Sequence, residues 1–130
     1  MLDEEMKSEF IEEGQTLHQN LLSGIKSLKE NLQDEEAIEN TFRSFHTLKG
    51  NAGFAGLSGI YRLYYGFTEF MRPVYDGKKD LSEDMLDKLP FLAKYVKQSL
   101  EKILRIFLKI LMNMSNGFIL KIKKKQFIKK

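Results

Sequence analysis

The sequence predicts an all-α fold: an up-and-down four-helix bundle followed by a short basic tail. The 130-residue chain contains only two prolines, and its apolar residues recur at helical spacing over long stretches. No stretch alternates apolar and polar residues as a β-strand does. A hydrophobic share of 42% suits a packed core within one domain. We expect the bundle to occupy residues 1–112 and the tail to occupy residues 113–130.

Boundary signals divide the bundle into four helices. Asp34, followed by two glutamates, is an N-cap candidate for the second helix, and Ser82 is one for the fourth. A glycine-rich turn at 54–59 separates the second and third helices. The expected helices span about residues 3–32, 35–53, 60–73 or 60–76, and 83–112.

Each expected helix has a stripe of apolar residues that should face the core, because residues three and four apart share one side of a helix. The stripes are Phe10, Gly14, Leu17, Leu21, Ile25, Leu28 and Leu32; Ala37, Ile38, Thr41, Phe45, Leu48, Ala52 and Ala55; Ile60, Leu63, Tyr64, Phe67, Met71 and Val74; and Met85, Leu89, Leu92, Val96, Leu100, Ile103 and Phe107.

Charge is distributed unevenly along the chain. Residues 1–100 hold 12 Lys and Arg against 17 Asp and Glu, a net charge of −5, whereas residues 101–130 hold 9 against 1, a net charge of +8. An acidic body argues against a nucleic-acid groove on the bundle. The chain has no cysteine, no apolar run of about 18 residues and no recognisable signal peptide, so we expect a cytoplasmic protein without disulfides.

The tail leaves several interpretations open. Beyond residue 117 its apolar residues alternate loosely with six lysines. The segment is interpreted either as a short fifth helix that packs on the bundle or as the start of a linker to further domains. A basic amphipathic segment also suits an anionic membrane surface or an acidic partner.

His46 is the candidate reactive residue. At about 100° per residue it points roughly 140° away from the centre of the apolar stripe on its helix, so it should face solvent. Its largely uncharged imidazole has a nitrogen that can attack a phosphoryl group and hold it covalently. Arg43 and Lys49, three residues to either side, could neutralise phosphoryl oxygens. Gly50 and Gly53 would let a partner or a phosphate approach the helix closely.

A plainer interpretation of the same residues stays open. His46 could be a surface histidine without a special role, as we expect for His18, and Arg43 and Lys49 could be ordinary solvated charges.

The helical geometry also places Phe42 on the outward side with His46, so the spacing predicts that its ring lies outside the core.

The stretch from Ala37 to Gly59, AIENTFRSFHTLKGNAGFAGLSG, resembles the signature of the histidine phosphotransfer (HPt) domain. It is most similar to the version at the N-terminus of CheA-type chemotaxis histidine kinases. The resemblance implies that His46 is phosphorylated, that Lys49 stabilises the phosphoryl group, and that Arg43, Gly50 and Gly53 serve partner docking and access. The positions that match the family pattern are Phe42, Arg43, His46, Lys49, Gly50, Gly53 and Gly56.

The chain departs from the family pattern on the facing helix. The chemotaxis-kinase version usually carries a second histidine nineteen residues after the first and a glutamate three residues further on, which orients the imidazole. Here those positions hold Tyr65 and Thr68, and Glu69 follows one place late. An offset of one residue turns a side chain by about 100°, whereas Thr68 could offer only a weaker hydrogen bond than a carboxylate. Thr68 and Glu69 are therefore the candidates for orienting His46, and we expect transfer to be slower or differently tuned.

The resemblance implies a phosphorelay carrier in chemotaxis-type two-component signalling. His46 would accept a phosphoryl group from the ATP-binding domain of a histidine kinase and pass it to an aspartate in the receiver domain of a response regulator. We expect no cofactor or metal in this domain, because ATP and Mg²⁺ would be used by the partner kinase domain. The chain lacks a P-loop and the hallmarks of a kinase catalytic domain, so kinase activity would belong to a longer parent protein or a partner.

Two other classes of function are alternatives to the relay. A non-catalytic interaction bundle would bind a membrane or an acidic partner through its basic tail, and His46 would then be incidental. A di-metal four-helix bundle needs Glu-x-x-His pairs, but Arg43 and Gln15 stand three residues before the two histidines. The sequence therefore argues against a metal site of this kind.

Overall fold

A computed structural model of the chain describes residues 4–114, and residues 1–3 and 115–130 lie outside the described part. The chain divides into two compact units, residues 1–100 and residues 101–130, which are described separately. The prediction of a fifth helix or a linker concerns the tail, nearly all of which lies outside the described residues.

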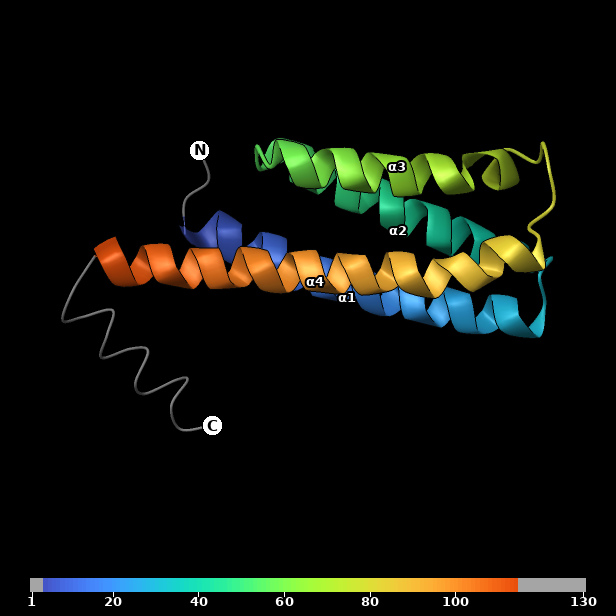
Figure 1. Cartoon of the computed structure of the whole chain (residues 1–130), viewed down its shortest axis with the longest axis horizontal. Coiled ribbons are helices and arrows are strands. Elements are labelled where there is room, and N and C mark those ends of the chain that lie inside the picture. Colours follow the sequence, from blue (N-terminus) through green and yellow to red (C-terminus); the bar gives the residue numbers. More distant parts are fainter. Residues whose placement is uncertain (1–3, 115–130) are drawn as a thin grey trace. The chain divides into compact units, whose positions relative to one another are not determined.

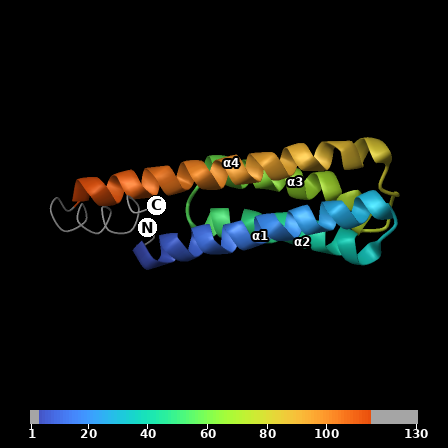
Figure 2. The same cartoon turned by 90° about the horizontal axis from the view of Figure 1, so that it is seen from below.

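Four helices make up the described chain, which contains no strand, so the all-α prediction is confirmed. Within residues 1–100, consecutive helices run in alternating directions, and α2 contacts both α1 and α3 (Figures 1 and 2). The helices are α1 (Glu4–Glu30), α2 (Glu35–Phe54), α3 (Ser58–Tyr75) and α4 (Glu83–Met114).

The helix boundaries follow from side-chain caps and one glycine. The Asp34 carboxylate accepts a hydrogen bond from the backbone N–H of Ala37 at 3.0 Å, and the Ser82 hydroxyl accepts one from Met85 at 3.1 Å. Both N-caps were therefore predicted correctly. Gly56 takes a φ of +74° in the turn between α2 and α3, a conformation that side chains with a Cβ rarely adopt.

Most of the predicted stripes form the core of residues 1–100. Ile38, Leu92 and four other stripe positions are only partly covered, and Leu63 is exposed. The buried apolar residues are Phe10, Ile11, Leu21, Ile25, Leu28, Ala37, Phe42, Phe45, Leu48, Ala52, Tyr64, Phe67, Met71, Val74, Leu81, Met85, Leu89, Ala93, Val96 and Leu100.

Phe42 corrects one expectation. Its ring was predicted to lie outside the core, yet only 5% of the residue is exposed. The ring of Tyr75, at the end of α3, stacks on it with 4.0 Å between the centroids and 11° between the planes. An aromatic side chain gains stability from such a partner, so the end of α3 covers a residue that α2 alone would leave in water.

Hydrogen bonds between helices add to the apolar packing. The Tyr64 hydroxyl on α3 shares a hydrogen bond with the hydroxyl of Ser99, which also donates to the Val96 carbonyl. The Asn40 side chain on α2 donates to the backbone carbonyl of Asn20 on α1 at 2.9 Å. These bonds give buried or partly buried polar groups a partner and favour one register of the helices.

Within residues 4–114, no helix is both long enough and apolar enough to cross a membrane.

Removal of the α2 cap should weaken the helix that carries His46. We expect Asp34→Ala to lower the free energy of unfolding by about 0.5–2 kcal/mol, because the Ala37 N–H loses its partner. Urea denaturation followed by circular dichroism measures the change. Glu35→Ala, one residue on and without the capping bond, is the control, and equal losses in the two variants would contradict the cap.

Candidate functional site

His46 lies on the outward face of α2 and is exposed to solvent. Its neighbour Phe45 is completely buried, so two consecutive residues face opposite sides of the helix. The imidazole stacks on the ring of Phe42 at 5.9 Å between centroids and 13° between planes. The outward orientation predicted from the sequence is confirmed, and the ring is open to an approaching protein.

Three positive charges act on the imidazole. Partial burial, followed in order of effect by the charges of Lys49, Arg72 and Arg43, lowers the pKa of His46 below that of an unperturbed histidine. A lower pKa leaves more of the imidazole neutral near pH 7, with a lone pair available for attack. The same charges are suited to stabilising the negative oxygens of a phosphoryl group.

Lys49 is held toward α3 by Tyr65. Its Nζ lies 5.4 Å from the centre of the Tyr65 ring, within the range of a cation–π interaction. Tyr65 stands where chemotaxis kinases usually carry a second histidine, and it is 48% exposed. An aromatic ring at this position therefore contacts the lysine on the face of α2 that carries His46.

Arg43 forms an exposed ion pair with Glu39 one turn earlier on α2. The distance from its Nε to the Glu39 carboxylate is 3.6 Å, and both side chains are more than half exposed. Exposed pairs of this kind contribute little to stability, so Arg43 is easily released to another anion.

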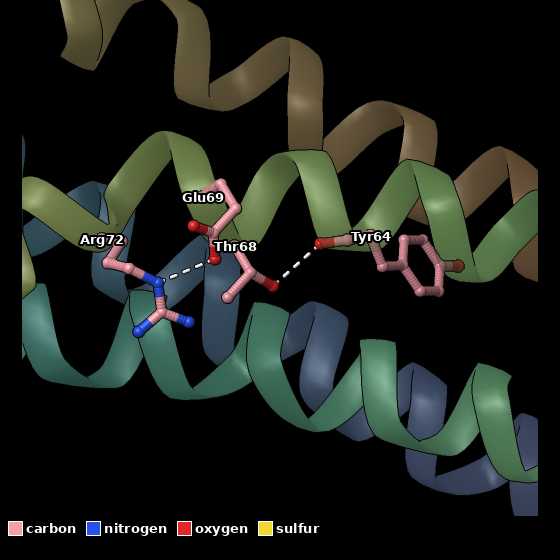
Figure 3. Close-up of polar contacts among 4 residues, drawn as sticks. All are labelled: Tyr64, Thr68, Glu69 and Arg72. Carbon is pink, nitrogen blue, oxygen red and sulfur yellow. Dashed lines mark hydrogen bonds and ion pairs between the residues drawn. The ribbon is translucent and has the colours of Figure 1, made fainter.

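Thr68 and Glu69 form hydrogen bonds with residues of their own helix (Figure 3). Thr68 is completely buried, and its hydroxyl donates to the Tyr64 backbone carbonyl at 2.8 Å. The Glu69 carboxylate accepts a hydrogen bond from Arg72 Nε at 2.7 Å. Among residues 4–114, no hydrogen bond to the imidazole of His46 is found, so the orienting roles of Thr68 and Glu69 stay predictions without support from these contacts.

The two glycines after Lys49 differ in their surroundings. A Cβ built at Gly50 would meet nothing within 4 Å, so the surface there is open. A Cβ at Gly53 would lie 3.1 Å from Cδ1 of Tyr61, so the missing side chain lets that tyrosine lie close to α2. Gly50 is the position whose surroundings agree with access for a partner.

The sequence patterns did not identify Arg72 as a cation close to His46. Arg72 lies on α3, seven residues after Tyr65 and three after Glu69, so helical spacing puts all three near one side of that helix. Its guanidinium carbon lies 5.2 Å from the centre of the Phe42 ring. The Glu-x-x-Arg spacing in the sequence indicates an ion pair between Glu69 and Arg72. It does not show that Arg72 lies close to α2, because that depends on how the two helices pack.

No group of three or more His, Cys, Asp or Glu side chains in residues 4–114 is arranged to hold a metal ion.

Comparison with known proteins identifies the family. The sequence-family model of the Hpt domain matches residues 5–106 of the chain. The chain belongs to this family. Two solved structures resemble the Hpt domain described here. The CheA phosphotransferase domain from Thermotoga maritima has a TM-score of 0.70 and 29% identity, and the match covers 77% of this chain and 95% of that chain. A solution structure of the histidine phosphotransfer domain of CheA has a TM-score of 0.71 and 28% identity, and the match covers 82% of this chain and 80% of that chain.

Curated relatives of this Hpt domain are much longer proteins. The chemotaxis protein CheA of Borreliella burgdorferi is 30% identical over 126 residues, which are 97% of this chain and 14% of that protein. The chemotaxis protein CheA of Halobacterium salinarum is 28% identical over 80 residues, which are 62% of this chain and 12% of that protein. The chain thus resembles the Hpt domain of CheA and spans about one seventh or less of these relatives.

The charges around His46 should be visible in its titration. We expect its Cε1 proton in a pH series of NMR spectra to give a midpoint below 6.5, because burial and three cations disfavour the imidazolium. Lys49→Ala should raise the midpoint, and Lys94→Ala, an exposed change on α4, should leave it in place. A midpoint at or above 6.5 in the unmodified protein would contradict the described electrostatics.

Proposed function

We propose that this domain is a phosphorelay carrier in chemotaxis-type signalling and that His46 is its phosphorylated residue. The observation that carries the proposal is an exposed, largely neutral imidazole beside Lys49, on the helix that carries the Hpt signature. The similarity to CheA phosphotransferase domains supports the same assignment.

In the first step a ring nitrogen of His46 attacks the γ-phosphorus of ATP held by the ATP-binding domain of a histidine kinase. The N–P bond forms as the bond from phosphorus to the bridging oxygen breaks, and ADP leaves with that electron pair. The proton on the second ring nitrogen passes to water. ATP and Mg²⁺ belong to the kinase domain, whereas this domain contributes the nucleophile and the cations.

In the second step the phosphoryl group leaves for a receiver domain. A carboxylate oxygen of an aspartate on the response regulator attacks the phosphorus, the N–P bond breaks, and its electron pair returns to the imidazole, which regains a proton from water. The product is an acyl phosphate on the regulator and a free His46. Both partners need to reach the same face of α2, which the open surface at Gly50 favours.

The relatives support a setting for the reaction. Because the chain spans 14% and 12% of two CheA proteins, the kinase and ATP-binding functions would be supplied by further domains of a longer protein or by a separate partner. The relay would then operate in the cytoplasm, where the kinase has access to ATP.

Phosphorylation by a kinase is the decisive test of His46. Incubation with ATP and the catalytic portion of a chemotaxis-type kinase should give acid-labile, base-stable phosphate. His46→Gln should abolish this label because the nucleophile is lost, and His18→Gln should retain it. A label that persists in His46→Gln would reject the assignment.

Lys49 is expected to serve transfer more than folding. We expect Lys49→Ala to slow phosphoryl transfer by about tenfold, because one cation at the reacting group is lost. The free energy of unfolding should fall by less than about 1 kcal/mol, because the substitution removes the cation–π interaction with the exposed ring of Tyr65. Rapid-quench transfer assays and urea denaturation measure the two effects, with Lys94→Ala as the matched control. Unfolding of the variant would instead assign Lys49 to the structure of the bundle.

A further inference from the structure

Arg72 is held in a defined position at the border between α3 and α2. Its Nε donates to the Glu69 carboxylate at 2.7 Å, and 39% of the side chain is exposed. Its guanidinium carbon lies 5.2 Å from the centre of the Phe42 ring on α2. Figure 3 shows the two terminal nitrogens directed from α3 toward α2. The Nε atom of the guanidinium is therefore bound to Glu69, and the two terminal nitrogens are directed toward the helix that carries His46.

Phe42 places this guanidinium and the imidazole of His46 on a common support. The imidazole stacks on Phe42, which is itself fixed by the stacked ring of Tyr75. The charge of Arg72 contributes to the lowered pKa of His46, after partial burial and the charge of Lys49. The positive charge of Arg72 thus acts at the reactive ring before any phosphoryl group is present.

Within the proposed relay, we propose that Arg72 binds the phosphoryl group on His46 through its terminal nitrogens while Glu69 holds its Nε. Lys49 approaches from α2, and Arg72 approaches from α3, so the phosphoryl oxygens meet cations from both helices. Glu69 acts through Arg72 and is a positioning residue. The inference rests on His46 being the phosphorylated residue.

The chemistry of arginine suits this role. A guanidinium is always charged, offers N–H groups in a planar fork, and binds phosphate oxygens with charge-assisted hydrogen bonds. A carboxylate beside the imidazole would favour its protonated form, whereas an arginine favours the neutral nucleophile and then the phosphorylated dianion.

The contacts of Glu69 agree with this positioning role. Its carboxylate bonds to Arg72, three residues on, and not to His46. Two negative groups, Glu39 and Glu69, each contact one of the arginines near the imidazole. Glu39 and Glu69 therefore hold the two arginines in position, and the imidazole of His46 stays available for the phosphoryl group.

The test uses the full chain phosphorylated by phosphoramidate, a small nitrogen–phosphorus donor that needs no kinase. We expect phosphohistidine in Arg72→Gln to hydrolyse about five- to tenfold faster than in the unmodified protein, because a charge-assisted bond to the phosphoryl group is lost. Arg72→Lys should give an intermediate lifetime, and Glu69→Gln a smaller loss. Arg62→Gln, an exposed arginine on the same helix, is the matched control and should show no change. The decay is followed by ³¹P NMR.

A second measurement separates binding from a structural effect. In the unphosphorylated protein, Arg72→Gln should raise the NMR titration midpoint of His46, and circular dichroism should show an unchanged helical fold. A phosphohistidine lifetime in Arg72→Gln equal to that of the unmodified protein overturns the inference and leaves the relay intact. Conversely, if the kinase with ATP fails to label His46 while the chemically formed phosphohistidine depends on Arg72, the relay is rejected and the phosphoryl-binding role of Arg72 is supported.

Discussion

The packing of α2 between α1 and α3 is the constraint on which the rest of the site depends. One side of α2 must be apolar enough to contact two helices, and this fixes the direction of every other residue on it. Phe45 is completely buried, so His46, turned by about 100°, faces solvent. The exposure of the His46 imidazole is thus a consequence of how its own helix is buried.

Phe42 connects this packing to the chemistry. The ring is buried by Tyr75, approached by Arg72 and stacked against His46. Aromatic side chains combine a large apolar area with faces that attract cations, so one residue can serve both the core and the site. The end of α3 is therefore part of the surface around His46, although the signature of the family lies on α2 and the turn that follows it.

Much of this arrangement could be predicted from the sequence, and the parts that could not share a physical reason. Helical periodicity, the Asp34 and Ser82 caps and the outward direction of His46 are local properties, and the structure agrees with them. The burial of Phe42 depends on Tyr75, which is distant in the chain. The Thr68 hydroxyl bonds to a carbonyl of its own helix, an option open to any helical threonine. The roles of the site residues in phosphoryl transfer and the nature of the tail stay predictions.

The three cations around His46 form a small positive area on a unit whose net charge is −5. At physiological ionic strength, exposed charges are screened over about 8 Å, so the positive area acts only at contact distance. Farther out, a dissolved polyanion encounters an acidic protein and gains nothing by approaching. Long-range attraction therefore adds little to the arrival of free nucleotides and phosphates, and an anion is attracted by the three cations only once it has come within contact distance of them.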